Sequence, residues 1–378
     1  MGNCIQKNHV DEMGRRAEKQ FKLIADQYEN WDQLTDALYV EQKLEVAQLS
    51  IFVDFTQSNK WTGKRTNGGL NLHHPYISAD EVGDQKVPIY QASAPTVPPP
   101  QYSSYQTGEQ DGIQPGTGST QYDAYTPVKT APLHRMGTMT DYTQLNQYEY
   151  VFHVASKPLR KMDKDGFIPL YAFGDEISND RAVRSMFGVE TDMDHQSVQS
   201  GLINPEEGCV GLEAVIGMYR QRAPRMVLSG GTSFAPAVRQ LIAQAQESKE
   251  YQIGIIITDG QISEGKCWRE TLRAISDASH HPISIIIVGV GDGDSPKDKQ
   301  GKYWRIMEDF DDNFDELAEK EGVPKRKFDN IQFVDSVKLR QECARSRNPE
   351  VRFATHMLME IPDQWEYIKR FILPNYGR

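Results

Sequence analysis

Long apolar runs constrain the fold of this chain more than any other feature of its sequence. Residues 252–258 and 283–290 are rich in isoleucine and carry apolar side chains at odd and even positions alike. A strand with one face in water alternates apolar and polar residues, whereas a parallel strand covered by helices is apolar on both faces. We therefore predict buried parallel strands in both runs. Shorter runs predict further strands at 49–54, 167–173, 225–229 and 331–334.

Segments with helical spacing lie between these runs. The predicted helices cover 145–160, 209–222, 234–248, 266–279 and 349–374, and apolar residues spaced by three, four and seven indicate helix within 12–48. Strands that alternate with helices are typical of a doubly wound α/β fold. We predict a mainly parallel six-stranded sheet with helices on both faces.

One segment departs from this pattern. Residues 76–140 are rich in Pro, Gly, Ser, Thr, Gln and Tyr. Such a composition cannot bury enough apolar surface to offset chain entropy. We therefore predict a long disordered insertion at 76–140, which divides an α/β domain made of 30–75 and 141–375. An anchor and helix would occupy 1–29.

Charge and cysteine usage exclude several classes of protein. The net charge of −11 argues against nucleic-acid binding, which requires a basic surface. Four scattered cysteines, at 4, 209, 267 and 343, form no Cys-x-x-Cys pair, so zinc ribbons and RING fingers are excluded and a reducing, cytoplasmic environment is favoured. We expect no transmembrane run and no signal peptide.

Oxygen-bearing side chains follow the apolar runs on three predicted loops. Asp54, Thr56 and Ser58 come directly after one run, Asp259 ends another, and Thr232 lies in a Gly-Gly-Thr-Ser stretch. Hydroxyls and carboxylates without Cys or His suit Mg²⁺, Mn²⁺ or Ca²⁺. Because ligands bind beyond the carboxyl ends of parallel strands, we predict a metal site here. The alternative is that Asp54 and Ser58 only cap a helix and close a turn.

Several motifs together resemble a known family. They are Asp54-Phe55-Thr56-Gln57-Ser58-Asn59, Trp61-Thr62-Gly63-Lys64, Leu72-His73-His74, Tyr171-Ala172-Phe173-Gly174-Asp175, Gly231-Thr232-Ser233-Phe234-Ala235-Pro236, Ile257-Thr258-Asp259-Gly260 and Phe328-Asp329-Asn330-Ile331-Gln332-Phe333-Val334. This set resembles the copine-type von Willebrand factor A domain over about 30–75 and 141–370. The segment Trp304–Asn313 is similar to the version in plant RING-type ubiquitin ligases.

The resemblance implies a Rossmann-like von Willebrand factor A fold with a metal-ion-dependent adhesion site. Ser58, Thr56 and Thr232 would ligate or position the ion, and Asp54 and Asp259 would act partly through water. A partner's Asp or Glu would fill the last coordination position. Copines also carry two calcium-dependent lipid-binding domains, and the plant ligases carry a RING. Neither is found in this sequence, so we expect neither calcium-driven lipid binding nor autonomous ligase activity.

The first residues, Met1-Gly2-Asn3-Cys4, resemble a dual acylation signal. Myristate would be attached to Gly2 and palmitate to Cys4, although Gln6 stands where Ser or Thr is usual. One myristoyl chain binds membranes only marginally, so Cys4 would supply the second anchor. The prediction is peripheral attachment at the cytosolic face of the plasma membrane. The alternative is an unmodified terminus.

A short motif within the insertion predicts a protein partner. Pro99, Pro100 and Tyr102 fit the Pro-Pro-x-Tyr ligand of WW domains, which is presented as a polyproline II ridge with one aromatic anchor. A chance occurrence in a segment rich in Pro and Tyr is the alternative.

The segment around Ser233 resembles the nucleophile segment of subtilisin-type proteases. It lacks the accompanying His-Gly-Thr and Asp-Ser/Thr-Gly stretches, so a loop that caps a helix is the better interpretation. We find no catalytic constellation and expect a metal-dependent protein-binding adaptor. The alternative is a component of the ubiquitin-ligase pathway, either a degenerate ligase or a recruiter of a WW-domain ligase.

Overall fold

The computed structural model describes residues 28–41, 44, 47–63, 71–74, 145–160, 166–187, 203–204, 208–260, 262–292 and 304–376. The predictions for the acylation residues Gly2 and Cys4, for the insertion at 76–140 and for the motif Pro99, Pro100 and Tyr102 lie outside these residues.

A six-stranded sheet forms the centre of the described structure. Its order is β4 (Arg184–Ser185), β3 (Leu170–Phe173), β1 (Gln48–Asp54), β7 (Gln252–Thr258), β8 (Ile283–Gly289) and β9 (Ile331–Asp335). All neighbouring strands are parallel except the edge pair β3–β4. A small antiparallel sheet contains β2 (Phe167–Ile168), β6 (Gly208–Val210) and β5 (Ile203–Asn204).

The strand order has a direct consequence for ligand binding. The first strand in the chain, β1, lies in the interior of the sheet. The next strands of this sheet, β3 and β4, lie on one side of β1, and β7, β8 and β9 lie on the other. The order therefore reverses between β1 and β7. In doubly wound sheets this switch point opens a crevice beyond the carboxyl ends of the two strands, and ligands bind there.

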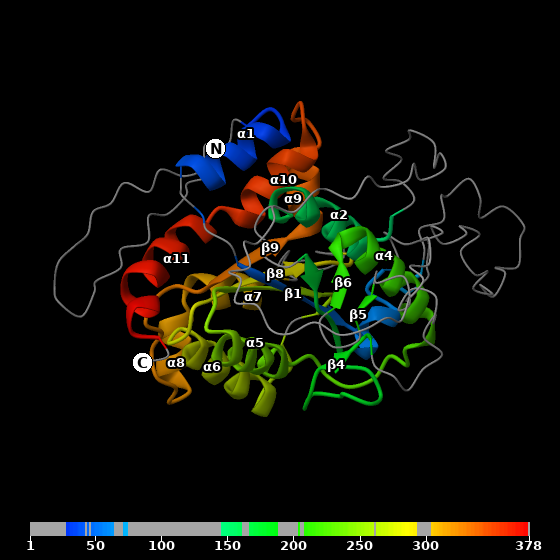
Figure 1. Cartoon of the computed structure of the whole chain (residues 1–378). Coiled ribbons are helices and arrows are strands. Elements are labelled where there is room, and N and C mark those ends of the chain that lie inside the picture. The colour runs from blue at the N-terminus through cyan, green and yellow to red at the C-terminus, as the bar shows by residue number, and fades with distance from the viewer. Residues whose placement is uncertain are drawn as a thin grey trace, which may run out of the picture.

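Helices cover both faces of the sheet, as predicted (Figure 1). One face is covered by α1 (Trp31–Asp36), α2 (Gln147–Leu159), α4 (Gly211–Arg222), α9 (Ser336–Cys343), α10 (Pro349–Leu358) and α11 (Ile361–Tyr367). The other face is covered by α5 (Ala235–Ser248), α6 (Lys266–Ala278), α7 (Arg305–Asp312) and α8 (Phe314–Lys320). Within β1, Ile51 and Val53 pack in the first core and Phe52 packs in the second. None of the described helices combines the length and the hydropathy that a bilayer-spanning segment requires.

Short helical turns complete the described elements. They are two π-helical turns, η1 (Ala37–Glu41) and η6 (Ile368–Ile372), and three 3₁₀ turns, η2 (Gln57–Lys60), η5 (Ala223–Arg225) and η7 (Leu373–Asn375). The segment predicted as one helix at 349–374 is thus divided into α10, α11, η6 and η7. Pro362 in the first turn of α11 is compatible with a new helix start but not with an uninterrupted helix.

Two strand predictions need correction. The predicted strand at 225–229 is wrong, because Leu228 and Ser229 form only isolated bridges. The Ser229 N–H donates to the carbonyls of both Phe55 and Gly174, each at 3.2 Å, so this segment joins two loops instead of extending along a strand. The predicted strand at 167–173 is interrupted at Pro169, which has no N–H to donate.

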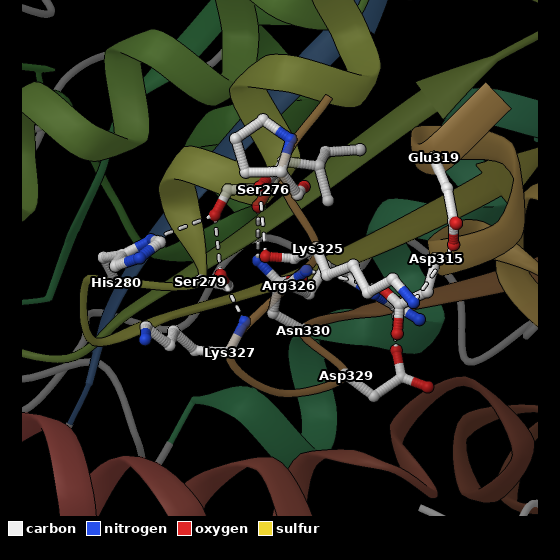
Figure 2. A network of polar contacts seen from close by, with 12 residues as sticks. Ser276, Ser279, His280, Asp315, Glu319, Lys325, Arg326, Lys327, Asp329 and Asn330 are labelled. Carbon is white, nitrogen blue, oxygen red and sulfur yellow. Dashed lines mark hydrogen bonds and ion pairs between the residues drawn. The ribbon is translucent and has the colours of Figure 1, made fainter. Parts of the chain in front are cut away.

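A buried arginine fixes the segment between α8 and β9 (Figure 2). The Arg326 guanidinium forms ion pairs with Asp315 and Asp329 and stacks over the Phe314 ring, and only 4% of its side chain is exposed. The Ser276 hydroxyl of α6 donates to the Pro324 carbonyl at 2.6 Å. These contacts precede the first residue of β9, so they lie at the amino end of the parallel strands.

Candidate functional site

The carboxyl ends of β1 and β7 bring the predicted site residues together. β1 ends at Asp54 and β7 ends at Thr258, and Val53 pairs with Ile257 in the preceding register position. The Thr258 hydroxyl donates to Asp54 Oδ2 at 2.6 Å. Asp259, the next residue, therefore enters the same crevice at the switch point of the sheet.

Side chains of the loop after β1 line this crevice. The Thr56 backbone N–H donates to Asp54 Oδ1 at 2.7 Å, which closes a tight turn. The Ser58 hydroxyl donates to Asp259 Oδ1 at 2.9 Å and lies 2.9 Å from the Thr56 hydroxyl. Thr56 Oγ1 is 3.4 Å from Asp259 Oδ1. Four of the five predicted side chains thus form one hydrogen-bonded cluster.

The fifth predicted residue, Thr232, reaches the cluster from a second loop. Its backbone N–H donates to Ser263 Oγ at 3.0 Å, and the Ser263 N–H donates to the Thr232 carbonyl at 2.9 Å. A Cβ placed on Gly260 would lie 3.3 Å from Thr232 Oγ1 and 3.4 Å from Ser58 Oγ. The two hydroxyls therefore border the same small space, which the hydrogen side chain of Gly260 leaves open.

Burial makes this cluster electrostatically unusual. Asp54 and Asp259 are both fully buried, and Thr56 is 1% exposed. Burial raises the pKa of Asp54 to about 6, although hydrogen bonds from Thr258 and Thr56 oppose the shift. Burial and repulsion from Asp54 raise the pKa of Asp259 well above its ordinary value. Two adjacent buried carboxylates are costly to ionise, and a divalent cation between them would remove that cost.

The donor set fits a hard cation. Within the described residues, no group of three or more His, Cys, Asp or Glu side chains is arranged to hold a metal ion, so a site here must combine two carboxylates with hydroxyls. Mg²⁺ and Mn²⁺ accept such oxygen ligands and keep several waters. Asp259 Oδ1 already accepts bonds from Ser58 and Asn59, at 2.9 and 2.8 Å, which suits a contact through water.

Several residues of this centre had no predicted role. Asn59 Nδ2 donates to Asp259 Oδ1 at 2.8 Å, and the Thr62 hydroxyl donates to Asp259 Oδ2 at 2.5 Å. Both residues stand in the motifs that carried the family resemblance. Sequence spacing could not reveal the contact, because Asn59 and Asp259 are 200 positions apart.

A buried histidine fixes the backbone of Asp54. The His73 ring lies between Phe55 and Tyr148, with centroid distances of 4.2 and 4.5 Å. Its Nε2 is 2.9 Å from the Asp54 carbonyl and its Nδ1 is 2.9 Å from the Tyr219 hydroxyl. A carbonyl only accepts, so Nε2 carries the proton. Burial lowers the pKa of His73 to about 3, which keeps the ring neutral.

The loop after β3 supports the cluster from the other side. Gly174 has a φ of +79°, and a Cβ there would lie 2.3 Å from Thr56 Cγ2 and 3.0 Å from Thr56 N. Only glycine allows this approach without strain. The next residue, Asp175, accepts from Ser178 and pairs with Arg184 at 3.1 Å, which holds the loop in place.

Comparison with known proteins identifies the family. The copine family model matches residues 132–374. Copine family protein 2 of Caenorhabditis elegans is 35% identical over 262 residues, which are 69% of this chain and 3% of that protein. The Arabidopsis thaliana E3 ubiquitin-protein ligases RGLG5 and RGLG3 are each 28% identical, over 93% and 94% of this chain and 60% and 72% of their own.

Solved structures are more distant. The manganese-loaded Plasmodium vivax TRAP protein aligns with a TM-score of 0.35 and 10% identity, over 81% of this chain and 74% of that chain, and a score this low supports no inference about the site. The family model spans well over half of the sequence and confirms the resemblance predicted from the motifs. The chain belongs to the copine family.

Proposed function

We propose that this protein is a metal-dependent protein-binding adaptor. Asp54, Thr56, Ser58, Thr232 and Asp259 would hold Mg²⁺, or alternatively Mn²⁺ or Ca²⁺. The bound cation supplies an electrophilic centre that attracts the acidic side chain of a partner protein. The observation that supports this proposal is the convergence of Thr232 and Ser58 on the space beside Gly260, next to two buried carboxylates.

Partner capture with and without a chelator tests the proposal. We expect proteins retained by the immobilised chain in Mg²⁺ to be released by EDTA and retained again when Mg²⁺ is restored. A bait with Thr232→Ala controls for partners that bind elsewhere on the surface. A set of partners that is the same with and without EDTA would contradict the proposal.

The raised pKa of Asp54 predicts a pH-dependent effect of the cation. A carboxyl whose pKa is raised by folding contributes stability below pH 3.8, which is lost as the pH rises through about 6. A cation bound to the ionised carboxylate restores this stability. Added Mg²⁺ should therefore raise the thermal midpoint more at about pH 7.5 than at about pH 5. An equal rise at both pH values would contradict the assignment of Asp54.

We further propose that acylation at Gly2 and Cys4 holds the adaptor at the cytosolic face of the plasma membrane. Gly2→Ala should shift the protein from the membrane fraction to the soluble fraction, because stable anchoring takes two signals and this variant loses the myristoyl chain. Cys4→Ser should give weaker, reversible attachment. Wild-type protein found only in the soluble fraction would contradict this proposal.

The names of the Arabidopsis relatives favour a second candidate function. These relatives are E3 ubiquitin-protein ligases, so this chain would act in the ubiquitin pathway, as a degenerate ligase or by recruiting a WW-domain ligase through Pro99, Pro100 and Tyr102. Two measurements separate the candidates. An adaptor transfers no ubiquitin with any conjugating enzyme, whereas recruitment predicts slower partner turnover in Tyr102→Ala.

A further inference from the structure

Large hydrophobic side chains are exposed beside the candidate site. In the described part of the chain, Trp61, Ile177 and Val227 are 48%, 67% and 55% exposed. Each lies in a loop that also contacts the Asp54–Asp259 cluster. Single exposed apolar residues are ordinary, but a group of them around one site marks an interaction surface. We call Trp61, Ile177 and Val227 the apolar rim.

Trp61 flanks the Ser58 side of the cluster. It directly follows η2, and its backbone N–H donates to the Ser58 carbonyl at 2.9 Å. The next residue, Thr62, donates its hydroxyl to Asp259 Oδ2. The Trp61 position is therefore fixed between two residues of the candidate centre, while nearly half of its surface is exposed to water.

Ile177 and Val227 flank the Thr56 side. The Glu176 N–H donates to the Val227 carbonyl at 2.9 Å, which brings the two loops together. Ser229, two residues after Val227, pairs with Thr56 in an isolated parallel bridge. The exposed pair is thus attached to the backbone of a predicted ligand residue.

Charged residues of both signs lie near the apolar rim, so a preference for an acidic occupant would come from the cation. Lys60 precedes Trp61, and Arg225 lies two residues before Val227; both are exposed. Glu176 opposes them, and Asp180 lies 3.8 Å from the Arg181 guanidinium, so that pair adds little net charge. Glu264, which is exposed beside Ser263, is a second acid near the site, so the bound cation itself would be the positive centre that the apolar side chains border.

We infer that the apolar rim selects partner segments in which the acidic residue is flanked by apolar side chains. This inference rests on the proposed function, because the acid is the group that would meet the cation. In an extended segment, residues two positions apart face the same way, roughly 7 Å from each other. A segment with apolar residues two positions before and after its Asp or Glu would place all three side chains on the site.

Synthetic heptapeptides with a central Asp test this inference. One carries Leu two positions before and after the Asp, a second carries Ser at both places, and a third carries Leu at both places with Asn in the centre. In Mg²⁺, we expect the Leu–Asp peptide to bind the full chain at least about tenfold more tightly than the Ser–Asp peptide. The affinity of the Leu–Asn peptide should be the same in Mg²⁺ as in EDTA.

Variants of the apolar rim locate the effect. Val227→Ser and, separately, Ile177→Ser should bring the ratio of the Leu–Asp and Ser–Asp affinities from about ten toward one. The Mg²⁺ affinity should not change, because both side chains are exposed and neither is a predicted ligand. Val40→Ser is the matched control, since Val40 is 69% exposed and lies on η1, before β1 begins. It should keep the full preference. Thermal midpoints verify that each variant is folded.

The outcomes separate this inference from the proposed function. If neither Asp peptide binds in Mg²⁺, the proposed function fails and the inference fails with it. If both Asp peptides bind equally and only in Mg²⁺, the proposed function stands and the apolar rim has no role in selection. If the Leu–Asp and Leu–Asn peptides both bind in EDTA as tightly as the Leu–Asp peptide binds in Mg²⁺, the apolar rim is an independent surface and the inference is overturned.

Discussion

Asp54→Asn should weaken Mg²⁺ binding at least about 100-fold and leave the fold intact. The Asn side chain has nearly the same volume as Asp, and the neighbouring groups can form hydrogen bonds with it. Its oxygen can still accept from the Thr56 N–H, and its NH₂ group can donate to Thr258 Oγ1. The Thr258 hydroxyl then donates to the Gly260 carbonyl, which is 3.1 Å away. The variant therefore removes a negative charge while its amide oxygen and its amide nitrogen each keep a hydrogen-bond partner.

Titration calorimetry and thermal unfolding measure this effect. Loss of an outer-shell partner already costs a metal site about 10–100-fold in affinity, so removing the carboxylate should cost at least about 100-fold. In wild type, Mg²⁺ at one hundred times its Kd adds about 2.7 kcal/mol, or about 5–10 °C in Tm. At the same Mg²⁺ concentration, Asp54→Asn should gain no more than about 0.4 kcal/mol.

The matched control for Asp54→Asn is Asp180→Asn, the same change at a partly exposed carboxylate on the neighbouring loop. This control should bind Mg²⁺ like wild type. The assignment of the site fails if Asp54→Asn retains wild-type affinity. A loss of affinity in both variants would instead indicate a general electrostatic effect of this surface.

Arg326→Met should lower the free energy of unfolding by about 3 kcal/mol. The Arg326 side chain is 4% exposed and pairs with Asp315 and Asp329, so its removal leaves two carboxylates without their cation. Breaking a buried pair in this way costs about 3–5 kcal/mol. Because the Asp315 and Asp329 side chains are 32% and 19% exposed, water compensates in part and we expect about 3 kcal/mol.

Urea unfolding compares the free energies of unfolding of Arg326→Met and of Arg239→Met, its control at an exposed ion pair. Arg239 pairs with Glu270 at 3.4 Å, but its side chain is 52% exposed, and such surface pairs contribute about 0–1 kcal/mol. Arg326→Met should retain wild-type Mg²⁺ affinity while folded, because its contacts lie at the amino end of the sheet and the candidate site lies at the carboxyl end. Equal losses in the two variants would contradict the role given to the buried pair.

Local patterns were sufficient wherever one element determines its own structure. The isoleucine runs at 252–258 and 283–290 predicted β7 and β8 closely, because continuous apolar character on both faces is compatible with few other structures. The edge strand β4, Arg184–Ser185, could not be found in this way. It is two residues long and has no pattern, and it forms only because β3 offers an unpaired edge.

The same division holds at the candidate site. Asp54 and Asp259 could be selected from the sequence because each follows a strong strand signal, and parallel strands end at the same edge of a sheet. Asn59, Thr62 and His73 could not, since their roles depend on acceptors or rings that other elements bring to them. The apolar rim is likewise invisible in the sequence, where Trp61 and Val227 resemble core residues.

The sequence by itself determined the alternation of strands and helices, the family and the five oxygen-bearing side chains, because these depend on neighbours along the chain. The tertiary structure decided which strand fills the sheet edge, how deeply the two carboxylates are buried, and which side chains remain exposed around them. Those properties depend on contacts between residues far apart in the chain, and burial is a property of the packed molecule alone.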